Sequence, residues 1–419
     1  MGARTGGNRR ERRPLPPGFG AIWTTVAVDL IGFGIVLPIL PRYAEDLHAT
    51  PLVIGLVVSA FSIAQMIGAP IIGRLSDRIG RKPVLILSLV GTALGSLVTG
   101  LAGTVWILFA GRVIDGLSGS SVSVAQAAVA DVAAPEDRPR LLGLLGAAFG
   151  VGFVAGPAIG ALAAFGGPHI PFLVAAAIAG INALVALRRL PETHPDRTGR
   201  PDPGAAERLG AGDAPDGPLP SEHPIRTWGH VPVAARRLIV VAFVALFAFS
   251  GFETTFSLLV EDRFGLTIGS TGAVFAVIGL ALVFVQAGLV HPVHAALGEK
   301  GTLRAALAVN ALGLLLLAVD GSWFTLVPAL LLLVLGQGLV TPTMTSAVAG
   351  EAPAADRGRV LGFQQSAGAL ARAIGPAVAG FLYGRVAVPA PYLLGAALAL
   401  GAVLLVPRGP RSVSGTAPT

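Results

Sequence analysis

Long apolar segments alternate with short polar ones along nearly the whole chain. Each apolar window holds roughly 18 to 25 residues, the length that an α-helix needs to cross about 30 Å of hydrocarbon. The windows lie at residues 20–41, 52–73, 84–102, 105–127, 140–164, 170–188, 238–260, 270–291, 302–320, 324–347, 359–382 and 389–407. This pattern predicts an all-α membrane protein with twelve transmembrane helices.

The apolar pattern stops at residues 189–237, where Pro, Gly and charged residues dominate. Such a segment buries too little apolar surface to fold by itself. We therefore expect a polar linker between two six-helix bundles, at residues 20–188 and 238–407. A basic N-terminal tail, 1–19, and a C-terminal tail, 408–419, complete the chain.

The two predicted bundles repeat each other at an offset of 219 residues. Asp137, Arg138, Arg140, Gly143 and Gly156-Pro157 return as Asp356, Arg357, Arg359, Gly362 and Gly375-Pro376. Shared spacing of this length predicts two pseudo-symmetric copies of one six-helix unit around a central cavity.

Basic residues divide unequally between the two membrane faces. If the N-terminus is cytoplasmic, 25 of the 30 Lys and Arg residues lie on the cytoplasmic side and three lie outside; Arg112 and Arg372 lie within spans. The positive-inside rule then places both termini and the linker in the cytoplasm. The net charge of +7 is explained by this orientation, so we expect a lipid bilayer and no nucleic acid as partner.

A short basic loop joins the second and third spans and reads Gly73-Arg74-Leu75-Ser76-Asp77-Arg78-Ile79-Gly80-Arg81-Lys82-Pro83. Its acid can accept hydrogen bonds from free amides at a helix N-terminus, whose dipole favours an anion. Alternatively, the basic residues serve only to orient the chain. A weaker copy lies at His291 to Arg304, where Ala295 stands in place of the acid.

This loop resembles the signature loop of the major facilitator superfamily of transporters. The resemblance implies that the acid latches one conformation by binding the eleventh span, which should begin near Arg359. The latch candidates are Gly73, Asp77, Arg78, Gly80, Arg81 and Lys82.

One acid lies deep in the first span. Asp29 is about nine residues inside the membrane, or about 14 Å at 1.5 Å per residue. A charged carboxylate there costs several kcal/mol unless it is paired, hydrated or protonated. Reversible protonation of Asp29 would couple a proton gradient to a change in shape; the alternative is a structural hydrogen-bonding role.

The fourth span carries a basic and an acidic residue on one helical face, Arg112 and Asp115. The segment 108–119 resembles the fourth-helix motif of the superfamily, in which the arginine is linked to proton transfer. Asp115 stands where that motif often has glutamine. Arg112 therefore either controls proton transfer or is neutralised by Asp115.

The fifth span carries glycines at helical spacing. Small residues at every fourth position open a groove that admits another helix, and a proline adds a bend. The pattern resembles the superfamily motif that is associated with antiporters. Its residues are Gly152, Gly156, Pro157 and Gly160.

The second bundle has one prominent intramembrane acid, Glu253 in the seventh span. Spans one, four, seven and ten line the central cavity if the superfamily fold holds, so we expect Glu253 to bind substrate or a proton unless it meets water outside. The proton-coupling candidates are Asp29, Arg112, Asp115 and Glu253, and further cavity-lining candidates are Gln337, Gln364, Gln365 and Arg372.

Enzymatic and metal chemistry are not indicated. The chain has no cysteine, which excludes thiolate ligands and cysteine nucleophiles. His291 and His294 have helical spacing but lack a third ligand. We expect no metal and no cofactor, with a proton gradient as the driving force.

Over nearly its full length the sequence is similar to bacterial drug:proton antiporters, in particular to the tetracycline-efflux branch. Residues 29–41, 73–85 and 169–194 carry this similarity. It implies a monomeric, multi-pass protein of the bacterial cytoplasmic membrane that exports a lipophilic or cationic small molecule in exchange for protons. A symporter or facilitator importing a sugar or another metabolite would use the same shell, and the sequence does not name the substrate.

Overall fold

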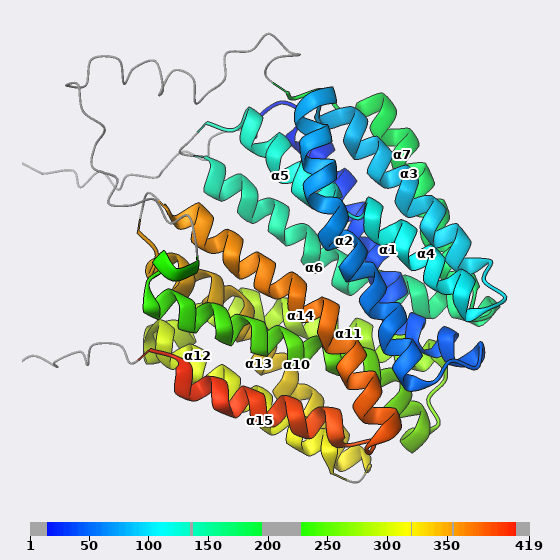
Figure 1. Cartoon of the computed structure of the whole chain (residues 1–419), viewed down its shortest axis with the longest axis vertical. Coiled ribbons are helices and arrows are strands. Elements are labelled where there is room, and N and C mark those ends of the chain that lie inside the picture. Colours follow the sequence, from blue (N-terminus) through cyan, green and yellow to red (C-terminus); the bar gives the residue numbers. More distant parts are fainter. Residues whose placement is uncertain (1–14, 135–136, 195–227, 320, 354–355, 408–419) are drawn as a thin grey trace, which may run out of the picture.

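The computed structural model describes residues 15–134, 137–194, 228–319, 321–353 and 356–407, which form α-helices joined by short turns (Figure 1). The first half comprises α1 (Phe19–Asp46), α2 (Pro51–Ile79), α3 (Arg81–Gly100), α4 (Val105–Ser118), α5 (Ser121–Val132), α6 (Arg138–Ala163) and α7 (Ile170–Arg189). The second half comprises α10 (Val233–Phe264), α11 (Ile268–Gly288), α12 (Val290–Ala318), α13 (Trp323–Gly350), α14 (Arg357–Arg385) and α15 (Ala390–Leu405). The predicted all-α class is confirmed.

Nine of the described helices are long and apolar enough to cross a membrane, namely α1, α2, α3, α6, α7, α10, α11, α12 and α13. Helix α15 is apolar but shorter. Helix α14 begins with a polar stretch that contains two arginines and two glutamines. The count of twelve crossings stays a prediction.

The predicted fourth span, 105–127, is wrong as a single helix. Helix α4 ends at Ser118, and α5 begins at Ser121 after a turn at Gly119 and Ser120. Serine and glycine are poor helix formers, so a run of them is easily bent. The side-chain amide of Gln65 in α2 donates a hydrogen bond to the Gly119 carbonyl oxygen and so supports the turn.

Between the predicted eighth and ninth spans, two helical stretches meet across a break within the expected loop region. Helix α12 begins at Val290 and kinks at Gly298, whose φ of 66° lies in the left-handed region that glycine adopts without strain. The weaker copy of the signature loop therefore contains a left-handed glycine between two helical stretches, as Gly80 does between α2 and α3.

The repeat seen in the sequence returns in the helix boundaries. Helix α6 begins directly after Asp137, and α14 begins directly after Asp356. Their packing partners also correspond, because α6 packs against α1 and α11 while α14 packs against α10 and α2. Each half thus offers one helix to a partner in the other half.

The two halves meet closely at the end that carries the turn between α1 and α2. A Cβ atom added to Gly55 of α2 would collide with the backbone of Pro376 in α14, and one added to Gly272 of α11 would collide with Ala161 in α6. Gly73 and Gly362 lie toward the other end of α2 and α14. A Cβ atom added to either of them would have no neighbouring atom within 4 Å. Figure 1 shows the first half, blue to green, beside the second half, green to red.

The predicted linker lies mostly outside the described residues, which omit 195–227. Its first residues, 190–194, lie against the start of α3, and α10 begins at Val233, five residues before the predicted span. Residues 1–14 of the N-terminal tail and the whole C-terminal tail, 408–419, also lie outside the described ranges.

Candidate functional site

Asp29 of α1 contacts the start of α5. Ser121, the first residue of α5, donates a hydrogen bond from Oγ to Asp29 Oδ2 at 2.5 Å. The other oxygen, Oδ1, is buried and has no hydrogen-bond partner among the described residues. Because a buried carboxylate oxygen without a partner is unfavourable, Asp29 has a place for one further proton or donor.

Arg112 and Asp115 of α4 form a buried ion pair. Arg112 Nη1 lies 2.7 Å from Asp115 Oδ2, and the side chains are 5% and 9% exposed. The guanidinium also lies over the ring of Phe61 in α2, 4.4 Å from its centroid, a cation–π arrangement. Thr92 of α3 provides a further hydrogen bond to Asp115. Of the two alternatives left open by the sequence, the structure has Arg112 paired with Asp115.

These side chains form one group within the first half. The carboxylate of Asp115 is close enough to act electrostatically on Asp29. We call Asp29, Arg112, Asp115 and Ser121 the first-half cluster. Sequence reasoning gave Ser121 and Thr92 no polar role, because serines in an apolar segment are equally well explained as small residues that ease helix contact until a partner is known.

The glycine motif of α6 positions α1 and with it Asp29. A Cβ atom at Gly152 would collide with the backbone of Leu30, the residue after Asp29, and one at Gly156 would collide with the backbone of Gly34. Gly160 lies against Ile35 and Ile39 one turn further. The groove that the spacing predicted in this helix is therefore occupied by α1.

A partly open pocket lies between the two halves. Four phenylalanines and one acid, Glu253, give it an apolar lining with a single ionisable group. Pro157, the proline of the glycine motif, also borders it. The lining residues are Gly34, Leu37, Pro38, Phe153, Pro157, Phe249, Phe252, Glu253, Phe275, Ile278, Gly279 and Leu282.

A second, smaller pocket shares part of this lining and extends toward α13. Gln337 borders it, and the Gln337 side-chain oxygen accepts a hydrogen bond from Asn310 Nδ2 of α12 at 3.2 Å. The two cavities together present one carboxylate and one amide on otherwise apolar walls.

The remaining candidates of the eleventh span lie elsewhere. Gln364 bonds to Thr345 at 3.4 Å, Gln365 is exposed, and neither lines either cavity. Arg372 is exposed and does not line them, although its charge acts on Glu253. Their expected role in lining the central pathway stays a prediction.

The first-half cluster does not line these cavities either. The sequence predicts one central polar pathway, whereas the structure has two groups: a cluster enclosed by α1, α3, α4 and α5, and Glu253 between the halves. The position of a residue along a span does not reveal the direction in which its side chain points.

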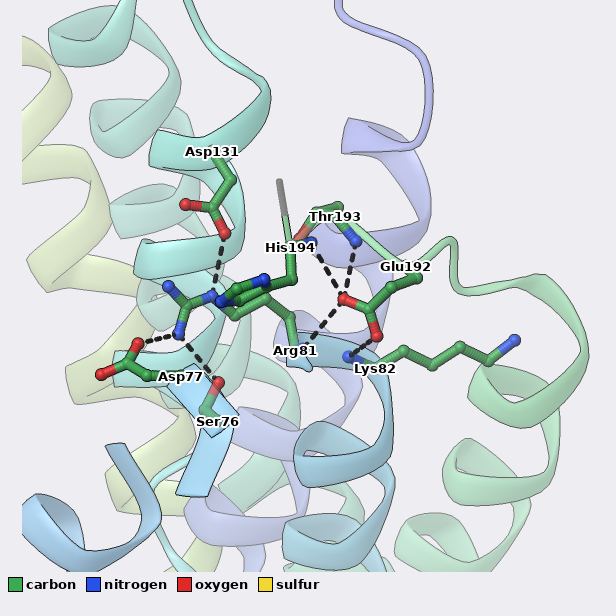
Figure 2. Close-up of polar contacts among 8 residues, drawn as sticks. All are labelled: Ser76, Asp77, Arg81, Lys82, Asp131, Glu192, Thr193 and His194. Atoms are coloured by element: carbon green, nitrogen blue, oxygen red, sulfur yellow. Dashed lines mark hydrogen bonds and ion pairs between the residues drawn. The ribbon is translucent and has the colours of Figure 1, made fainter. Parts of the chain in front are cut away.

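Arg81 organises the loop between α2 and α3 (Figure 2). Its guanidinium bonds to Asp77 Oδ1 at 2.5 Å, to Ser76 Oγ at 3.0 Å and to Asp131 Oδ2 of α5 at 2.8 Å. Asp77 is 64% exposed and pairs with Arg81 within its own loop. The expected latch contact with α14 is not formed, because α2 and α14 meet at the opposite end, near Gly55.

The acid that binds helix amides here is Glu192, which follows α7 (Figure 2). Its carboxylate accepts hydrogen bonds from the backbone N–H groups of Arg81, at 2.9 Å, and Lys82, at 3.2 Å. Gly80, with a φ of 104°, turns the chain into this position. The sequence analysis assigned no acid to this helix end; its prediction for Asp77 concerned the start of the eleventh span.

The charge state of Glu192 follows from these contacts. Burial by itself raises the pKa of Glu192, but hydrogen bonds from the backbone amides of His194, Arg81, Thr193 and Lys82 outweigh it and hold that pKa below its ordinary value. Glu192 is therefore an anion at the positive end of α3.

Charged residues also join the halves at the end where they meet. Arg42 of α1 forms an ion pair with Glu261 of α10, and it bonds to Glu45 at 3.0 Å. Beside them, the Tyr383 hydroxyl of α14 donates to Asp262 Oδ2 at 2.5 Å. Sequence reasoning used Arg42 only for orientation, because its partner lies more than two hundred residues away.

Comparison with known proteins identifies relatives over nearly the whole chain. The family model described as Major Facilitator Superfamily matches residues 22–297 and 288–419. The tetracycline resistance protein, class C, of Escherichia coli is 30% identical over 393 residues, which cover 92% of this chain and 95% of that protein. Multidrug resistance protein 2 of Bacillus subtilis is 28% identical, covering 87% of this chain and 88% of that protein.

A solved structure has a similar fold. The crystal structure of the human organic anion transporter MFSD10 (TETRAN) superposes with a TM-score of 0.66 at 28% identity, covering 94% of this chain and all of that chain. Sequence and structure comparisons therefore agree on the fold of the whole chain.

Proposed function

The chain belongs to the Major Facilitator Superfamily, and we propose that it is a proton-coupled exporter of small lipophilic compounds. That it is a multi-pass membrane transporter, and not an enzyme, follows from the family and the relatives. The direction of transport, the coupling ion and the cargo are the proposal.

We propose twelve crossings with both termini in the cytoplasm. The nine long apolar helices, the short α15, the more polar α14 and the broken pair α4 and α5 together supply them. The basic residues support the orientation. The bacterial resistance proteins among the relatives support a place in a bacterial cytoplasmic membrane, and a monomer is sufficient because both halves lie in one chain.

In this orientation, the end where the halves meet faces outward. The structure then represents the conformation open toward the cytoplasm, in which the cavity would receive a compound from inside. Rocking of one half against the other would expose the same cavity to the outside, as in other transporters with two related halves.

The observation that carries the proposal is the position of Glu253. It places one carboxylate on the wall of an aromatic, apolar cavity between the two halves. Such a wall binds a lipophilic compound, and one carboxylate can hold either a proton or a cationic group. Competition between the two at one acid produces exchange, because the binding of one releases the other.

Asp29 provides a second place for a proton, separate from the cargo. When Asp29 binds a proton, the energetic cost of a charge in the membrane interior disappears. When Asp29 releases that proton to the cytoplasm, the carboxylate becomes charged again. We propose that Arg112 and Asp115 keep their fixed ion pair beside Asp29 and set the electrostatic potential in which it titrates.

Inside-out membrane vesicles with an imposed pH gradient test the proposal. The Escherichia coli relative is named for tetracycline resistance, so tetracycline and a lipophilic cation are the first cargoes to test. We expect gradient-driven uptake, which Asp29→Asn and Glu253→Gln abolish while the purified variants stay folded. Accumulation in right-side-out vesicles under an inward proton gradient would instead identify a symporter.

A further inference from the structure

Helix α5 has a polar contact at each end, and the two contacts belong to different parts of the molecule. In its first turn, Ser121 donates a hydrogen bond to Asp29 inside the membrane. In its last turn, Asp131 accepts a hydrogen bond from Arg81 in the α2–α3 loop (Figure 2). The two residues are ten positions apart, which is about 15 Å along a helix axis.

The break before α5 makes it a separate short element. The turn at Gly119 and Ser120 interrupts the backbone hydrogen bonds that would join α5 to α4. Gln65 of α2 fixes the α4 side of this break at the Gly119 carbonyl oxygen. A displacement at the start of α5 can therefore reach its far end without moving the Arg112–Asp115 pair on α4.

One face of α5 packs into the core of the first half. Val124, Ala125, Ala128 and Val129 are buried there against apolar residues of α1, α3 and α6. This face has small side chains, so hydrogen bonds, rather than interlocking bulky groups, fix the position of α5 along its axis. The contacts at Ser121 and Asp131 are the ones that do so at its two ends.

We propose that Ser121 and Asp131 are positioning residues, and that α5 transmits the state of Asp29 to Arg81 in the cytoplasmic loop. An ionised Asp29 accepts the Ser121 hydroxyl. A protonated Asp29 is a weaker acceptor, and the first turn of α5 is then released. Because Arg81 is shared between Asp131 and Asp77, movement of α5 changes how Asp77 is held.

Few charged groups act at either end of this connection. At Asp29, the neighbouring charge is Asp115, which is itself paired with Arg112. At Arg81, the neighbouring charges are Asp77 and Asp131, and Glu192 binds the Arg81 backbone amide. A change at the loop that follows a change at Asp29 therefore has α5 as its direct structural route.

Hydrogen exchange on the purified full-length protein in lipid nanodiscs tests the connection without transport. We expect Asp29→Asn, which imitates the protonated acid, to increase exchange at residues 76–82 by at least about threefold, a coupling of ordinary strength. Ser121→Ala should give the same increase, and Asp29→Asn combined with Ser121→Ala should give no more than either alone. Ser121→Thr keeps the hydroxyl, so this variant should exchange at residues 76–82 at the wild-type rate.

A matched control is available on the same helix. Ser123 is exposed and donates its hydroxyl to the Ser120 carbonyl oxygen, so Ser123→Ala should leave exchange at 76–82 unchanged. The reverse experiment uses Asp131→Asn, which should increase exchange at residues 121–124, because coupling between two sites is reciprocal. If Ser121→Ala does not fold, Asp131→Asn serves as the test of the connection in its place.

The consequence for efflux rests on the proposed proton coupling. Ser121→Ala and Asp131→Asn should shift the pH midpoint of efflux in the same direction. If folded Asp29→Asn and Asp131→Asn variants each exchange like the wild type at the opposite end of α5, the connection is overturned. If the wild-type protein shows no proton-driven transport while the exchange coupling is present, the proposed function fails and the connection stands.

Discussion

The two halves hold their intramembrane acids in opposite surroundings. In the first half, Asp115 is paired with Arg112 and Asp29 is bound by Ser121, all among helices of the same half. In the second half, Glu253 lies on the wall of the cavity that both halves share. An acid enclosed within one half acts on the packing of that half, whereas an acid between the halves is available to a ligand.

The same contrast holds at the helix ends. In the first half, Arg81 is shared by Asp77 and Asp131, and Glu192 caps the helix that begins there. In the second half, Lys300 has a single ion pair with Glu351 at 2.5 Å, beside the kink of α12. Among the described residues, Arg81 therefore joins two acids at once, whereas the ion pairs Lys300–Glu351 and Arg359–Asp356 of the second half each join one base to one acid.

Asp115→Asn tests the enclosed side of this comparison and should have the largest effect. It leaves Arg112 buried without its charge partner, so we expect a loss of about 3–5 kcal/mol in the free energy of unfolding. Denaturant unfolding in detergent measures it. The double variant Arg112→Met/Asp115→Leu removes both charges and should recover most of the loss; a loss below about 1 kcal/mol for Asp115→Asn would contradict a tightly coupled pair.

Glu253→Gln tests the shared side and should affect binding rather than folding. Without the carboxylate, affinity for a lipophilic cation such as tetraphenylphosphonium should fall roughly tenfold, which corresponds to about 1.4 kcal/mol. Equilibrium binding to the purified protein measures this, with unfolding as a check on stability. Gln365→Ala is the control, because Gln365 is exposed and is not among the residues that line the two described cavities. Equal affinities in the wild type and Glu253→Gln would remove Glu253 from the binding site.

Glu192→Gln examines the cap at the start of α3. Because the pKa of Glu192 is held below its ordinary value, the carboxylate stabilises the fold at neutral pH, and this contribution is lost as the pH falls below about 4.3 and through the lower folded value. We expect a loss of at most about 1 kcal/mol at pH 7, since the group is partly exposed. This loss of stability would appear as faster hydrogen exchange at the Arg81 and Lys82 backbone amides in Glu192→Gln.

The wild-type protein provides the control for this prediction. The difference in exchange between wild type and Glu192→Gln should shrink as the pH falls below about 4.3 and disappear once the pH lies below the lowered folded pKa of Glu192. A difference that persists unchanged at low pH would show that the charge of Glu192 is not the stabilising feature.

Lys300→Ala should have the smallest effect. Both side chains of the Lys300–Glu351 pair are about a quarter exposed, so the pair contributes at most about 1 kcal/mol to the free energy of unfolding. Arg81→Ala, which removes bonds to two acids, should cost more in the same measurement. Equal losses would show that the extra contacts of the first half add no stability.

Much of the helical framework follows from local sequence. The span predicted at 170–188 is the helix Ile170–Arg189, and the span predicted at 324–347 is Trp323–Gly350. The error falls at Gly119, where a glycine permits either a continuous helix or a break and neighbouring helices select which. Hydropathy does not register such a choice, because the segment stays equally apolar in both cases.

The amino-acid pattern alone specifies a bundle of apolar helices with a few charges inside the membrane, since hydrocarbon thickness and the cost of a buried charge act on each segment separately. Helix packing specifies the partners of those charges. Asp29 meets Ser121 across 92 positions, Arg81 meets Glu192 across 111, and Glu253 reaches the shared cavity because α10 lies beside α1. Such contacts depend on how helices are rotated and placed against each other, and no single segment contains that information.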